Sequence, residues 1–174
     1  MSCFLEKEDG RVNAVLSFRR SELLYDVRNC AYIEGSVMDT AQGHLRHMVQ
    51  DVGEEGNVDR VTRVLDLAVA KCKELLYPYT RHKIHRPVVD DVLRQTKVYG
   101  IVLSVPSDFS QTSLNLLERL IHEYLVCKTV GDWLSITNPS KAQVWEVKAE
   151  EAVSEIRGSL HARMGRRRRR PHPF

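Results

Sequence analysis

The most regular pattern of apolar positions lies between residues 58 and 79, where an apolar residue recurs every three or four positions. This spacing places the side chains on one face of an α-helix. We expect Asn57 to cap the start of this helix and Pro78 to end it. At this length the pattern is more typical of a bundle helix than of a coiled coil. The apolar positions are Val58, Val61, Leu65, Ala68, Cys72, Leu75 and Tyr79.

The same spacing appears on both sides of Asn138 and Pro139 and predicts a long helical hairpin. A residue that precedes proline disfavours the helical conformation, so the first helix should end by Asn138, while Pro139 suits the first turn of the second. Ser110 or Thr112 is the expected N-cap. The apolar positions are Leu114, Leu117, Ile121, Tyr124 and Leu125 before the turn, and Ala142, Trp145, Ala149, Ala152, Ile156 and Leu160 after it. We expect Trp133 and Trp145 to anchor the packing around the Pro139 turn.

Patterns in the rest of the chain are weaker. Residues 1–10 are expected to be a flexible lead-in. Residues 12–18 and 97–105 read as short strands, the second with a bulge at Gly100. Residues 21–33 read as a helix that Ser21 caps and Gly35 ends, and residues 38–52 as another. The predicted fold class is therefore mainly α: a helical bundle with a long C-terminal hairpin, one or two short strands and a basic C-terminal extension.

The distribution of charge divides the chain into a body and a tail. A chain of 174 residues, 43% of them hydrophobic, is long enough for one domain with a core of its own. We expect a single helical domain over residues 1–164 and an arginine-rich tail over residues 165–174. The net charge is +3, but residues 157–174 hold seven arginines and no acid, which leaves −4 for residues 1–156. This asymmetry indicates an acidic or polyanionic partner at the tail.

The candidate binding residues belong to this tail. Adjacent arginines repel one another and do not form a core, whereas their guanidinium groups bind phosphates and carboxylates. Phe174, which follows a proline, is a candidate to fill an apolar pocket of a neighbour. The sequence leaves open whether the tail contacts DNA or protein. The candidate residues are Arg163, Arg166, Arg167, Arg168, Arg169, Arg170 and Phe174.

No motif predicts catalysis, a cofactor or a metal site. His122 and Glu123 begin a sequence that resembles a zinc-protease helix, but Val126 stands where the second histidine is needed. An enzyme would need His122, Glu123 and Asp132 in one pocket, and we expect the adjacent His122 and Glu123 to point apart on a helix. The four widely spaced cysteines are typical of reduced, buried thiols. No apolar run is long enough to cross a bilayer, so we expect no membrane contact.

Several segments in order along the chain resemble a known family. ELLYPYT (residues 74–80) precedes a strand that ends at Val105 and Pro106, and LIHEYLVCKTVGDWLSITNP (120–139) and EIRGSLHARMGRRRRR (155–170) follow. This succession is similar to the small, mainly helical head–tail connector (adaptor) proteins of tailed bacteriophages, particularly phages of Bacteroidales. The resemblance covers residues 57–170 best, whereas the greater length and the arginine tail depart from the family.

The resemblance implies a structural protein of the virion neck, without enzymatic activity, cofactor or metal. It implies a closed ring of about twelve identical subunits between the portal protein and the tail or neck proteins, around the DNA channel. Such a subunit is made in the host cytoplasm, and its role as adaptor, stopper or tail-completion protein stays open. The alternative is a small nucleic-acid-binding protein that its basic tail anchors on DNA, although a net negative body argues against it.

Overall fold

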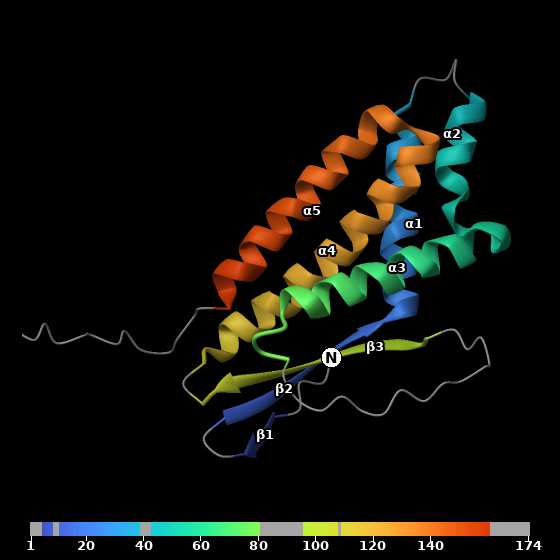
Figure 1. The fold of residues 1–174 in the computed structure, drawn as a ribbon. Helices are drawn as coiled ribbons and strands as arrows, with labels where there is room; N and C mark the ends of the chain where they lie inside the picture. The colour runs from blue at the N-terminus through green and yellow to red at the C-terminus, as the bar shows by residue number, and fades with distance from the viewer. Residues whose placement is uncertain (1–4, 9–10, 39–42, 81–95, 108, 161–174) are drawn as a thin grey trace, which may run out of the picture.

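The structure, a computed structural model, describes residues 5–8, 11–38, 43–80, 96–107 and 109–160. In it, a small antiparallel sheet lies beneath a larger group of helices (Figure 1). The sheet holds the strands in the order β1 (Leu5–Glu8), β2 (Arg11–Arg19) and β3 (Val98–Pro106). The helices are α1 (Arg20–Ser36), α2 (Gly43–Gln50), α3 (Glu55–Leu75), α4 (Gln111–Thr137) and α5 (Pro139–Ser159), with a short 3-10 turn η2 (Asp51–Gly53) after α2. The predicted mainly α class with minor β is confirmed, although the sheet has three strands rather than one or two.

The sheet buries one face and exposes the other. The register of β2 and β3 is continuous from the pair Arg11 and Pro106 to the pair Arg19 and Val98. Both predicted strands are therefore confirmed, and the bulge expected at Gly100 is wrong. Alternate residues of the two strands point to the helices and are buried, as the period of two in a strand requires. These residues are Ala14, Leu16, Phe18, Tyr99, Ile101, Leu103 and Val105.

Strand β1 lies within the segment that the sequence predicted to be a flexible lead-in. Leu5 pairs with Ala14 and Glu8 with Arg11, so the expectation of flexibility is wrong for residues 5–8. Three of the four residues of β1 are charged, and such a segment has no apolar alternation to reveal a strand. Backbone hydrogen bonds to β2, which the side-chain pattern does not reveal, hold this strand in the sheet.

Helix α1 follows β2 directly, and two of its predicted end signals are wrong. Its N-cap is Arg19, without a capping side chain, and the expected cap Ser21 lies inside the helix. Gly35 does not end the helix but lies in its last turn, beneath α2. A Cβ atom at Gly35 would stand 2.6 Å from Cγ of Gln50, so the missing side chain permits this close approach. The helix predicted over residues 38–52 is observed as α2 and η2, from Gly43 onward.

Helix α3 confirms the most regular pattern of the sequence. Its buried residues Val61, Leu65, Ala68 and Cys72 belong to the predicted face. The predicted N-cap is wrong, however. The cap is Glu54, and the side-chain amide of Asn57 instead donates a hydrogen bond to the carbonyl oxygen of Asp51 at 2.9 Å.

Helices α4 and α5 form the predicted hairpin, and they run side by side across the top of the sheet and α3 (Figure 1). Ser110 is the N-cap of α4, because its Oγ accepts a hydrogen bond from the backbone N–H of Ser113. The helices come close at Gly131, where an added Cβ would lie 3.3 Å from Oε1 of Glu146. All the apolar positions that the sequence assigned to the two inner faces are buried.

Both tryptophans of the hairpin are buried and tie it to the N-terminal helices. Nε1 of Trp133 donates a hydrogen bond to the carbonyl oxygen of Val49 at 2.8 Å, which joins α4 to α2. Nε1 of Trp145 donates to Oε1 of Glu34 at 3.1 Å, which joins α5 to α1. Pro139 occupies the first turn of α5, as its fixed backbone angle favours.

Candidate functional site

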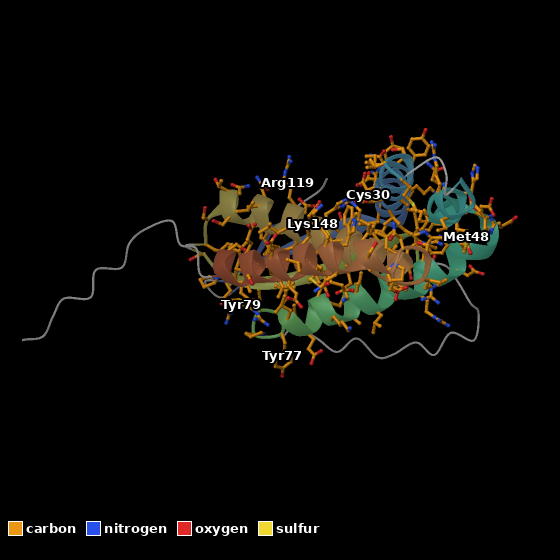
Figure 2. All side chains as sticks on the ribbon, turned by 90° about the horizontal axis from the view of Figure 1, so that it is seen from above. Cys30, Met48, Tyr77, Tyr79, Arg119 and Lys148 are labelled. Atoms are coloured by element: carbon orange, nitrogen blue, oxygen red, sulfur yellow. The ribbon has the colours of Figure 1, made fainter. Side chains whose placement is uncertain are left out.

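A groove of about 500 Å³ lies where β2 and β3 meet α1 and α4, and we call it the charged groove. Helix α4 contributes Glu118, Arg119, His122 and Glu123 to its lining. The sheet contributes Phe18, Arg19 and Val98, and α1 contributes Glu22. Seen from above, Arg119 and Cys30 lie on one long side of the helical layer and Tyr77 on the other, so Arg119 of the groove lies on the same side as Cys30 of α1 (Figure 2).

A contact between His122 and Asp26 lies beside the charged groove, because His122 lines both this groove and a neighbouring hollow that Asp26 also lines. Nε2 of His122 lies 2.7 Å from Oδ2 of Asp26, which joins α4 to α1. His122 and Glu22 also line a shallower hollow of about 340 Å³ that continues along α1 to Tyr25. A carboxylate on one ring nitrogen fixes the orientation of an imidazole. Ser21 lines the same hollow, and among the described residues no hydroxyl forms a hydrogen bond with the ring.

The charges of the groove are mixed. Its lining holds three carboxylates and two guanidinium groups, and Arg19 lies 3.5 Å from Glu22. The described part of the chain has no group of three or more His, Cys, Asp or Glu residues that could hold a metal ion. This lining suits a polar, extended ligand with charges of both signs better than a small anion or a metal.

The groove corrects one expectation about its residues. The sequence predicted that His122 and Glu123 point apart, yet both line the same groove. Asp132, the third residue considered, lies elsewhere and accepts a hydrogen bond from Arg60 of α3 at 3.0 Å. Sequence reasoning did not find the groove, because its lining comes from four elements that are far apart along the chain.

Three thiols lie near or within the helical core and are weak acids. Burial raises the pKa of Cys127 from 9.0 to about 12, and the carboxylate of Glu123, which accepts a hydrogen bond from Sγ at 3.4 Å, adds to the rise. Burial likewise raises the pKa of Cys72 to about 12 and raises that of Cys30. These cysteines are therefore protonated at neutral pH and poor nucleophiles.

The outward side of α1 and the residue after its end carry four exposed large apolar side chains, with the exposed polar residues Asn29 and Ser36 among them, and we call this surface the α1 face. It consists of Tyr25, Tyr32, Ile33 and Val37, which are 69%, 60%, 52% and 73% exposed. Tyr25 and Tyr32 are seven residues apart and so lie on one line along the helix. The buried residues Leu23, Val27 and Ala31 occupy the opposite side. Because Tyr25 also lines the hollow next to the charged groove, the two features adjoin.

The outer side of α5 carries a second unusual surface, which we call the α5 face. A shallow hollow of about 450 Å³ there is lined by Val147, Glu150, Glu151, Ser154 and Glu155. Val144, one turn before Val147, is also half exposed. Within the described residues, none of the three glutamates makes an ion pair.

The structure describes the predicted structural residues but not the predicted binding residues. The structural residues Trp133, Pro139 and Trp145 stand at the hairpin as given above. The predicted binding residues lie outside the described part of the chain: Arg163, Arg166, Arg167, Arg168, Arg169, Arg170 and Phe174.

Comparisons with known proteins add no family assignment. The chain matches no protein-family model, no curated protein sequence and no solved structure. Among the described helices, none combines the length and the apolar character that crossing a membrane requires.

Proposed function

We propose that the protein is a structural subunit that assembles with copies of itself into a ring, and that this ring is the head–tail connector in the neck of a tailed bacteriophage. The exposed α1 face is the observation that carries the proposal. Large contiguous apolar surfaces on soluble proteins mark interaction sites, and tyrosine is one of the residues most enriched at interface centres. The sequence resemblance to phage connectors supplies the identity of the assembly.

The partner at the α1 face is a second copy of the chain. A ring needs two different surfaces on each subunit, because one surface of a copy meets the other surface of the next. The α1 face is one candidate for these two surfaces. Each contact need only be weak, since closure of the ring adds the contacts together.

In such a ring the charge asymmetry of the chain has a role. Residues 1–156 carry a net charge of −4, which weakens any grip of the body on passing DNA. The arginines of residues 163–170 then supply the attraction to an acidic surface of a neighbour or to DNA phosphates.

A matched pair of substitutions tests the role of the α1 face. Tyr32→Ser removes an aromatic ring from the centre of this face, whereas Leu67→Ser removes a side chain of similar exposure, 56%, from α3. We expect Tyr32→Ser to weaken self-association at least tenfold in sedimentation velocity runs, because a central aromatic contact contributes about 2 kcal/mol. Leu67→Ser should leave association unchanged.

Two results would overturn the proposal. The first is equal association of the Tyr32→Ser and Leu67→Ser proteins. The second is a wild-type chain that stays monomeric at every concentration and binds duplex DNA with an affinity that falls steeply with salt. This second result would instead support the nucleic-acid-binding alternative.

A further inference from the structure

The α5 face holds its negative charge in an unfavourable arrangement. Glu150, Glu151 and Glu155 all lie in the C-terminal half of α5 and line the same shallow hollow. Glu151 and Glu155 are four residues apart on the same side of the helix, and like charges at this spacing repel. None of the three has an ion-pair partner within the described residues. A cationic segment on this face would relieve the repulsion between these carboxylates.

We propose that the α5 face binds the arginine-rich segment of a neighbouring copy, residues 166–174. The inference rests on the proposed function, since a ring places a second copy beside every subunit. The charges are complementary: the face carries three glutamates, and the segment carries five adjacent arginines and no acid. Guanidinium groups match carboxylates in shape as well as in charge, because the two can form paired parallel hydrogen bonds.

The apolar part of the segment also has a counterpart on the face. Val144 and Val147 are 50% and 48% exposed at the N-terminal end of the glutamate cluster. Phe174 follows the arginines at the other end of the segment. When the segment runs antiparallel to α5, the arginines lie over the glutamates and the aromatic ring covers the two valines. Burial of Phe174 then gives the contact an apolar contribution that salt does not screen.

The lengths of the two partners agree. Val144 and Glu155 are about 16 Å apart along the helix axis, since each helical residue rises about 1.5 Å. In an extended chain, Arg170 and Phe174, which are four residues apart, span about 13 Å. Arg166 and Phe174, which are eight residues apart, span about 26 Å. The segment is therefore long enough to place its aromatic ring on the valines while its arginines reach all three glutamates.

The charged groove is a poorer acceptor for the same segment. Its three carboxylates share their lining with Arg19 and Arg119, and Arg19 already lies 3.5 Å from Glu22. An incoming arginine would meet two like charges in that lining and none among the residues that line the hollow of the α5 face. The groove residues Glu118 and Glu123 therefore serve as the matched control.

Photo-crosslinking of the full-length protein tests the assignment. Phe174→p-benzoylphenylalanine places the reactive group in the segment, and an equal mixture of this chain with an isotope-labelled wild-type chain is irradiated. We expect cross-linked peptides that join residue 174 of the unlabelled chain to residues 144–147 of the labelled chain. Combined Glu150→Gln, Glu151→Gln and Glu155→Gln changes in the labelled chain should reduce their yield about tenfold, since each exposed ion pair contributes little alone. Combined Glu118→Gln and Glu123→Gln changes should not alter it.

Three results would overturn this inference. The first is a set of cross-links confined within single chains, which would show that the segment binds its own helix. The second is a set of cross-links that map to the charged groove or elsewhere. The third is a cross-link yield that the glutamine changes at α5 do not reduce. Any of these in a chain that still self-associates through the α1 face would refute only the role of the α5 face. A chain that does not self-associate at all would refute the proposed function as well.

Discussion

Single side chains join the helical layer of this protein through a small number of directed contacts. Trp133 links α4 to α2 and Trp145 links α5 to α1, each through its indole N–H. The acceptors differ. Trp133 donates to a backbone carbonyl in a buried position, whereas Trp145 donates to the carboxylate of Glu34, which lies 3.6 Å from Nζ of Lys141 as well. The two tryptophans therefore differ in how much their hydrogen bonds should contribute to stability.

Replacement of each tryptophan by phenylalanine should separate the two cases. Trp133→Phe leaves the buried carbonyl oxygen of Val49 without its indole donor and should lower the free energy of unfolding by about 2 kcal/mol. Trp145→Phe should lower it by less than about 1 kcal/mol, since Glu34 keeps Lys141 nearby. Both changes remove the same atoms, and Trp145→Phe also alters the contact of the ring with Nζ of Lys148 at 4.2 Å, so the urea unfolding curves compare the hydrogen bonds together with their surroundings. Equal losses would contradict this account.

The buried thiols predict how stability depends on pH. The pKa of Cys127 and that of Cys72 are raised to about 12, mainly by burial, while an unfolded chain loses these protons near 9.0. Above pH 9 the unfolded state therefore binds fewer protons than the folded state, and the free energy of unfolding falls as pH rises. Each thiol should account for a loss of about 1 kcal/mol between pH 8 and pH 10.

Cys127→Ala provides the check on this pH dependence. Urea unfolding measured at both pH values should show a smaller fall for the variant than for the wild-type chain, even though the variant is less stable at pH 8. Identical falls in the two proteins would mean that Cys127 ionises as freely in the folded state as in the unfolded state.

The helical hairpin depends on how closely α4 and α5 approach. Gly131 lies at the contact, where an added Cβ would stand 3.3 Å from Glu146, whereas Gly158 of α5 has open space around the same position. Gly131→Val should lower the free energy of unfolding by about 2 kcal/mol, because the added methyl groups push the helices apart. Gly158→Ala should raise it by about 0.5 to 1 kcal/mol through lower entropy of the unfolded chain. Thermal unfolding of both variants measures the contrast, and a stable Gly131→Val protein would contradict the close packing.

The spacing of apolar residues predicted the helices that turn an apolar face to the core. Leu65 and Ala68 lie on the single buried face of α3, and the spacing of three and four revealed it. The same spacing located Leu117 and Ile121 of α4, although this helix is buried on more than one side from Tyr124 to Leu134. Strand β1 escaped prediction because its charged side chains carry no such signal. The caps expected at Ser21 and Asn57 failed for another reason: tertiary neighbours, not the local preference of the residue, determine where α1 and α3 begin.

The candidate surfaces were less predictable than the elements. Glu22, Val98 and His122 line the charged groove although they come from segments that are far apart in the sequence. No local sequence pattern predicts that these residues lie together. The α1 face was not predicted, because the sequence does not show which tyrosines of an amphipathic helix remain exposed in the folded protein. By contrast, the basic character of residues 163–170 is evident from composition alone.

The whole molecule combines two exposed apolar surfaces, an acidic helix face and a basic segment in one small chain. In the proposed ring, the α5 face would meet the basic segment of the next copy and the α1 face would meet another copy, so head-to-tail assembly would cover both. An assembly of this kind stops growing at a fixed number of subunits, whereas an open arrangement would continue to lengthen. Closure is thus the property that distinguishes a connector from a general tendency to aggregate.

The most direct test of the account is the mass distribution of the full-length protein as its concentration rises, measured by sedimentation velocity at low and high salt, with and without duplex DNA. The account predicts one discrete oligomer that forms from monomer, stops at a fixed size, and forms without DNA. A chain that remains monomeric and associates only on DNA, or that forms an unlimited series of larger species, would contradict it.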